Sequence, residues 1–362
     1  MFLVLACVLS MPAMADANYD KQYENIGADT LEQNLSEQTK EFFDINNIDA
    51  KNPDWVAGFT SKSVIEYVCR LYTTEMKKPL KTGVMTASII FISAAFTAFG
   101  SSPRFENAIY VAVLCICAII STSVWQSVSA AISAIKSCSA FMFSFVPVFA
   151  SVLALSGKTV TAAATSTLLL TTIEAVSFFV SFGVLPLMGG YLALSIASGV
   201  SPLLNNSGIV ECVKKISMWI MSLLCTLFVG VLGIQTAVNS AADSVALRTA
   251  KFILGTSVPV AGGVLSEAVS TISASMGLLR SSIGVYGVVA LAITLIPIIL
   301  ELILWRFIFM LNISLSELFS LQKTAGILRA VDSMLSVLLG VMLLVGGLFI
   351  ISLSVVITAG KT

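Results

Sequence analysis

The sequence predicts an all-α polytopic membrane protein with about seven to eight transmembrane helices. Hydrophobic residues make up 57% of the 362 residues and charged residues only 11%, whereas a soluble domain carries roughly 25% charged residues. From residue 84 onward, apolar runs recur at lengths close to the ~20 residues that a helix needs to cross a bilayer. Two apolar segments share a proline-containing phrase, which indicates an internal duplication with Pro-broken hairpins.

Residues 1–15 resemble a secretory signal peptide. An apolar core is followed by Ala13, Met14 and Ala15, a small-x-small cleavage site, and then by Asp16. The basic residues that usually precede such a core are absent, and a short N-terminal membrane anchor is the alternative interpretation. Cleavage after Ala15 would place the mature N-terminus outside the cytoplasm.

Residues 16–82 form a polar, acidic segment that we expect to be exported. Residues 1–83 hold 12 of the 20 acidic residues and 8 of the 20 basic residues. Apolar positions in this segment predict short amphipathic helices, and the best of these runs from Asp54 to Tyr72. We expect that helix to lie against the membrane or a partner.

Residues 83–362 are predicted to form the polytopic membrane domain. The predicted spans are residues 84–100, 106–125, 160–182, 184–200, 216–237, 284–305 and 334–357. The first and fourth of these are short for a span and could pair as hairpins. Lys and Arg residues occur on both sides of the predicted spans, so the positive-inside rule does not orient the domain.

Two segments, residues 139–156 and 252–275, contain Val-Pro-Val followed by an apolar residue, two small residues, Val and Leu. A proline followed by small residues weakens a helix and lets backbones approach closely. We therefore expect a re-entrant or interfacial hairpin at each segment, although the first could also cross fully. In the second segment, Gly262 and Gly263 could form a hinge or a close helix–helix contact, and we favour the contact.

The similarity between the two segments extends further along the chain. Pro147 is followed 39 residues later by Pro186, and Pro259 is followed 38 residues later by Pro297. A more polar connector and another span follow each second proline. This agreement in spacing predicts that the membrane domain is duplicated.

The predicted copies are residues 106–215 and 216–330, and a final helix at 334–357 would begin a truncated third copy. An odd number of crossings per copy would make the halves inverted, and an even number would make them parallel. The path of residues 139–156 decides between these two arrangements. The candidate structural or gating residues are Pro147, Pro186, Pro259, Gly262, Gly263 and Pro297.

Four charged residues are candidate intramembrane polar residues: Glu174, Glu267, Glu301 and Arg306. A carboxylate in a membrane costs on the order of a few kcal/mol and usually faces a cavity or a partner. We interpret Glu174 as lining a passage or binding a partner helix, or else as reaching the interface from near a helix end. Arg306 lies five residues from Glu301, a poor distance for a helical pair, so we expect it to extend to the membrane surface.

The composition excludes several classes of function. The chain has no histidine, which removes the commonest general base and metal ligand. Cys115 and Cys117 lie two residues apart in an apolar helix and so on different faces, which favours packing over metal ligation. The sequence contains no ATP-binding loop or dinucleotide fingerprint, and neither half is basic enough for nucleic acid. We therefore expect no enzyme, no cofactor, no metal and no catalytic residue.

These features together resemble the stage III sporulation protein AE family of endospore-forming bacteria. The resemblance rests on the signal peptide, the polar exported segment and the polytopic domain. It also rests on the phrase from Val258 to Gly263, on Glu267 and Ala268 after it, and on the C-terminal residues 357–360. The resemblance covers nearly the whole chain. The phrase around Pro259 is fairly specific to this family, whereas the general hydropathy is not.

The resemblance implies a core membrane subunit of a channel complex that the mother cell builds toward the forespore and that late forespore gene expression requires. The implied partners are other stage III sporulation A proteins, including a separate ATPase, and membrane lipids, with homo-oligomerisation left open. The implied location is the mother-cell membrane facing the forespore. An autonomous secondary transporter for a small solute and a purely structural scaffold of the complex remain as alternatives.

Overall fold

The computed structural model describes residues 28, 30–50, 77–98, 103–184, 186–191 and 262–359, together with isolated residues between 55 and 70 and between 193 and 245. Every element in this part of the chain is a helix, and none of its residues belongs to a strand. Five of its helices are long and apolar enough to cross a membrane. The predicted all-α polytopic membrane class is therefore confirmed.

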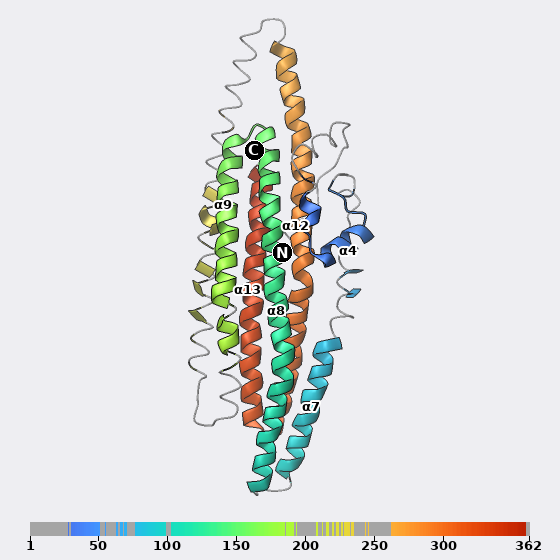
Figure 1. Cartoon of the computed structure of the whole chain (residues 1–362), viewed down its shortest axis with the longest axis vertical. Coiled ribbons are helices and arrows are strands. Elements are labelled where there is room, and N and C mark those ends of the chain that lie inside the picture. Colours follow the sequence, from blue (N-terminus) through green and yellow to red (C-terminus); the bar gives the residue numbers. More distant parts are fainter. Residues whose placement is uncertain are drawn as a thin grey trace.

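Three long helices form the centre of an elongated bundle (Figure 1). They are α8 (Pro103–Leu155), α12 (Gly262–Leu318) and α13 (Gln322–Ala359). At 1.5 Å per residue, the 53 residues of α8 extend for about 80 Å, more than twice the ~30 Å hydrocarbon core of a bilayer. The central helices are therefore longer than a single membrane crossing needs.

Tight turns join the helices into antiparallel pairs. α8 and α9 (Thr159–Phe178) meet at residues 156–158, where Gly157 has a φ of 82°. That left-handed conformation is the usual way for a helix to end, and glycine adopts it without steric cost. α12 and α13 meet at residues 319–321, where Ser320 has a φ of 57°. Both turns are short, so the paired helices lie side by side.

Two flanking helices lie at different levels of the long helices (Figure 1). α7 (Lys77–Ala98) lies beside the lower part of α8 and α12 in the figure, whereas α9 lies beside the upper part of α8. α7 comes close to α12 at Gly83, where a Cβ atom would collide with Ile308. α9 continues through a π-helical turn, η1 (Phe179–Val184), toward the described residues 186–191.

The N-terminal segment contributes two short helices, α3 (Thr30–Gln33) and α4 (Glu37–Ile45). α3 contacts α8, and α4 contacts α12. Leu31, Phe42 and Phe43 are buried with side chains no more than 3% exposed. The described part of this polar segment therefore packs against the bundle.

Aromatic side chains and glycine allow α8 and α12 to pack closely. Phe141, Phe145 and Phe149 follow one another along α8, with successive ring centroids 5.7 and 5.5 Å apart. All three are buried. Phe145 packs against Gly287 of α12, where a Cβ atom would come within 2.5 Å of the ring. Only glycine therefore fits at this crossing without moving Phe145.

The helix break expected at Pro147 does not occur. α8 continues through Pro147 to Leu155, so the predicted span 106–125 and the segment 139–156 belong to one helix. The chain reverses at residues 156–158 instead, so the hairpin expected at Pro147 is wrong, and the continuous helix agrees with the alternative of a full crossing. A proline removes one backbone hydrogen bond from a helix. Because the Pro147 ring is exposed, it displaces no packed side chain, and the helix continues past it.

The second proline phrase lies largely outside the described residues. Pro259 is among the residues that the structure does not describe, while Gly262 and Gly263 form the first turn of α12. Pro297 lies inside α12. The signal peptide also lies outside the described residues, as do ten of the 22 residues of the predicted span 216–237. The predicted domain boundaries and the duplication therefore stay predictions.

Replacing Pro147 with alanine should stabilise the protein. Alanine restores the missing backbone N–H and has the highest helix propensity, and the position is exposed, so no packing is lost. We expect the free energy of unfolding to rise by about 1–2 kcal/mol, less than the ~3 kcal/mol that separates the two residues in helix interiors, because α8 has already adjusted to the ring. Thermal or chemical unfolding in detergent measures the change. A less stable Pro147→Ala protein would contradict a helix that continues through this position.

Candidate functional site

The structure places the predicted polar residues in different surroundings. Glu174 lies on an exposed face of α9, whereas Glu301 and Arg306 of α12 are partly buried. Glu267 belongs to the helical backbone of α12, and its side chain is outside the described part of the chain. Pro186 is exposed after η1. Glu301 and Arg306 are therefore the predicted charged residues whose described side chains enter the bundle.

Glu301 joins α12 to α8. Its Oε1 atom accepts a hydrogen bond from the Ser127 hydroxyl at 2.6 Å and another from the Trp305 indole N–H at 3.3 Å. Ser127 and Trp305 are buried, with 2% and 1% of their surface exposed. A partly buried carboxylate needs such donors in place of water. Glu301 therefore acts as an interhelical contact about one turn after Pro297.

Arg306 joins α12 to α13. Its Nε atom donates a hydrogen bond to Oδ1 of Asp332 at 3.0 Å. The antiparallel turn at residues 319–321 brings them together, since each lies about three helical turns from it. The expectation that Arg306 extends to the membrane surface stays a prediction, because its side chain is 37% exposed beside this contact. Asp332 supplies a counter-charge on the neighbouring helix for the partly buried guanidinium.

Asp332→Asn should weaken the packing of α12 on α13, because it leaves the charge of Arg306 without its counter-ion. The side chains of Arg306 and Asp332 are 37% and 26% exposed, so solvent screens the pair and we expect a loss of about 1–2 kcal/mol in unfolding free energy. The exchanged variant Arg306→Asp with Asp332→Arg should recover most of that loss. Thermal unfolding in detergent measures both. Equal destabilisation by the single and the exchanged variant would show that pairing is not the cause.

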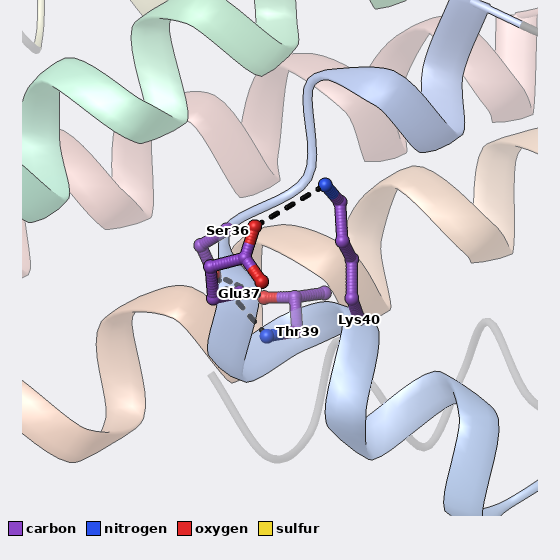
Figure 2. Close-up of polar contacts among 4 residues, drawn as sticks. All are labelled: Ser36, Glu37, Thr39 and Lys40. Atoms are coloured by element: carbon purple, nitrogen blue, oxygen red, sulfur yellow. Dashed lines mark hydrogen bonds and ion pairs between the residues drawn. The ribbon is translucent and has the colours of Figure 1, made fainter.

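A hydroxyl cluster joins α4 to α12. Thr294 of α12 is 9% exposed, and its Oγ1 atom lies 2.9 Å from Oγ1 of Thr39 and 3.3 Å from Oγ of Ser36. Ser36 is also the N-cap of α4, because its hydroxyl accepts a hydrogen bond from the Thr39 amide at 3.3 Å (Figure 2). The residues that start α4 thus also attach it to α12. In the same turn, the ion pair between Glu37 and Lys40 at 3.4 Å is on the surface.

A charged cluster lies where α8 turns into α9. The two carboxylate oxygens of Asp243 accept hydrogen bonds from the amides of Val160 at 3.0 Å and Thr161 at 2.9 Å. The first amides of a helix lack intrahelical partners and carry a partial positive charge, which favours a carboxylate there. Asp243 is 1% exposed. Asp243 therefore caps the start of α9.

Two basic residues accompany Asp243. Lys158 in the turn is 9% exposed, and Arg280 of α12 is 6% exposed. Burial lowers the pKa of the Lys158 ammonium, the positive charge of Arg280 lowers it further, and Asp243 opposes both effects. Lys158 thus experiences both a buried carboxylate and a buried cation near the start of α9.

The sequence alone does not single out Ser127, Asp243, Thr294 or Asp332 as functional residues. Ser and Thr are frequent in these apolar helices, so nothing in their spacing distinguishes Ser127 or Thr294. Asp332 did carry a signal: it is the one acidic residue between Glu317 and the C-terminus. The contacts of these residues are hydrogen bonds and ion pairs that join helices. The site can therefore hold the bundle together and set the relative positions of its helices.

Comparison with known proteins identifies relatives of the chain. The family profile "Stage III sporulation protein AE" matches residues 46–360. The curated protein "Stage III sporulation protein AE" of Bacillus subtilis (strain 168) is 24% identical over 316 residues, which cover 85% of this chain and 79% of that protein. No solved structure matches the chain. The matched residues include all five candidate membrane helices.

Proposed function

The chain belongs to the stage III sporulation protein AE family, and we propose that it is a membrane core subunit of the channel complex between mother cell and forespore. The family itself supports a role in sporulation. On this proposal the protein contributes helices to a secretion-like or feeding apparatus that late forespore gene expression requires. It performs no chemical step and needs no cofactor.

The proposed location is the mother-cell membrane facing the forespore, with the mature N-terminus outside the cytoplasm. The proposed partners are other stage III sporulation A proteins. One of them would be a separate ATPase, because this chain has no ATP-binding loop. Membrane lipids would cover the remaining apolar surface, nucleic acid is not a partner, and homo-oligomerisation is left open.

The main support for the proposal is the family match, which includes all five candidate membrane helices of the bundle. Two features of the bundle agree with it. The central helices are longer than one bilayer crossing needs. Large apolar side chains are exposed on α7, among them Val84, Phe91 and Ile92, and on α12, among them Phe307 and Met310. Such surface suits lipid or the helices of other membrane subunits.

Deletion and complementation in sporulating cells test the proposal. Loss of the protein should block late forespore transcription, and the full chain should restore it. Affinity purification of the full chain from sporulating membranes should recover other stage III sporulation A proteins and an ATPase. Normal forespore transcription after deletion, with loss of uptake of one solute, would contradict the proposal and favour an autonomous transporter.

A structural scaffold of the same complex is the second candidate, and one observation favours it. Glu301 and Arg306 each contact another helix of the bundle, and Glu174 lies on an exposed face of α9, which suits a structural role among the described residues. Pro297→Ala separates the two roles. A complex that assembles but does not support forespore transcription would favour conduction, and full activity would favour the scaffold.

A further inference from the structure

We propose that residues 30–50, called here the N-terminal strap, are a releasable clamp that ties α8 to α12 beside Pro147 and Pro297 and limits bending there. The strap includes α3 and α4, and α4 lies against α12 in Figure 1. It touches both long helices, through contacts far apart in the sequence. This inference concerns the mechanics of the bundle and does not depend on the role in sporulation.

The strap is attached to α12 through hydroxyl groups. Thr39 is fully buried and bonds to Thr294 at 2.9 Å, and Ser36 lies 3.3 Å from the same oxygen. Ser36 and Thr39 also bond to each other at 2.7 Å and form the N-cap of α4 (Figure 2). Loss of the bond to Thr294 would therefore disturb the start of α4 as well, so the strap docks and folds as one unit.

A second attachment point is on α8. The side-chain amide of Asn34 donates a hydrogen bond to the Ser144 hydroxyl at 2.7 Å. Asn34 lies between α3 and α4, two residues before Ser36, so successive side chains of the strap reach different long helices. The strap is therefore a bridge between α8 and α12.

Apolar contacts add to the attachment. Phe43 of α4 is 3% exposed and packs edge-on against Tyr286 of α12, with ring centroids 4.8 Å apart. The hydrogen bonds from Asn34, Ser36 and Thr39 to the long helices join uncharged groups. These are individually weaker than charge-assisted bonds. Such contacts can hold the strap against α8 and α12 and can also break without a large cost in free energy.

Each attachment point lies next to a proline of the helix it touches. Ser144 comes three residues before Pro147, and Thr294 comes three residues before Pro297. A proline inside a helix leaves the carbonyl four residues earlier without its usual amide partner, which makes the helix easier to bend at that point. Here those carbonyls belong to Phe143 and Ile293. The strap thus bridges the two weakest points of α8 and α12.

Hydrogen exchange on the purified full-length protein in detergent tests the clamp. Thr294→Val removes the hydroxyl and keeps the shape of the side chain. We expect backbone amides flanking both Pro147 and Pro297 to exchange about five- to tenfold faster. Thr171→Val is the matched control, because Thr171 is exposed and its hydroxyl bonds only to Thr167 of its own helix. The control should leave exchange at both prolines unchanged.

A covalent lock provides the opposite test. With the native cysteines replaced, Thr39→Cys and Thr294→Cys should form a disulfide, because the two native oxygens lie 2.9 Å apart. Oxidation should slow exchange at both prolines, and a reductant should reverse the effect. Thr39→Cys with Ser314→Cys, about 30 Å farther along α12, should not form the bond. Failure of the first pair to cross-link, or exchange near Pro147 that does not respond to the lock, would overturn the proposal.

Discussion

Gly287→Leu should prevent the chain from accumulating as a folded membrane protein. A Cβ atom at Gly287 would lie 2.5 and 2.8 Å from two ring atoms of Phe145, closer than atoms can pack. Phe145 is fully buried between Phe141 and Phe149, so its ring has little room to move. We expect a loss of about 3 kcal/mol in unfolding free energy, the upper end of the usual cost of overpacking a core. Thermal unfolding in detergent and the folded yield from membranes measure it.

Two further variants decide whether the crossing of α8 and α12 is the cause. Gly287→Ala adds only the Cβ atom and should cost less than the leucine. Gly326→Leu on α13 is the matched control, because nothing lies within 4 Å of a Cβ atom there and leucine favours a helix more than glycine does. The control should be neutral or stabilising. Equal stability of Gly287→Leu and the natural protein would show that α8 and α12 do not cross as described.

Asp243→Ala should loosen the end of the bundle at which α8 turns into α9. The substitution removes the acceptor of two amides of α9 and the negative charge that acts on Lys158. Asp243 is 1% exposed, so water does not replace the carboxylate without local opening. We expect a loss of about 3 kcal/mol, as for removal of one partner of a buried ionic contact.

The measurement is unfolding in detergent combined with hydrogen exchange at the first turn of α9. Asp243→Asn should fall between the natural protein and the alanine variant, because an amide oxygen still accepts one hydrogen bond but carries no charge. Asp44→Ala is the control; Asp44 is exposed on α4, and its loss should change stability by less than about 0.5 kcal/mol. Unchanged exchange at Val160 and Thr161 in Asp243→Ala would contradict the capping role.

The sequence predicts the class of this protein well, because apolar composition and run length depend on local chemistry alone. The predicted spans 160–182, 284–305 and 334–357 lie within described helical residues. The sequence wrongly predicts a helix break at Pro147, because a proline shows that one backbone hydrogen bond is missing but not whether the helix ends there. Packing of Phe145 and Phe149 on either side keeps α8 continuous, and that packing depends on α12, which is far away in the sequence.

The polar contacts were harder to predict for the same reason. The sequence identifies Glu301 and Arg306 as unusual in an apolar stretch, but their partners Ser127 and Asp332 lie on other helices. Pairing Arg306 with Asp332 requires knowing that α12 and α13 turn back at residues 319–321. Thr294 is one of many hydroxyl residues in the chain, and only the docked position of α4 distinguishes it.

The length of α8 has a mechanical consequence. The part of α8 from Pro103 to Ser144, about 60 Å long and without an internal proline, acts as a lever: a tilt of about 5° about the Ser144 end displaces the other end by about 5 Å. α8 carries the contact with the N-terminal strap at Ser144 and the contact with α7 at Ser123, 21 residues apart. A small rotation where the strap is attached is therefore amplified along this part of α8 toward the end of the bundle beside α7.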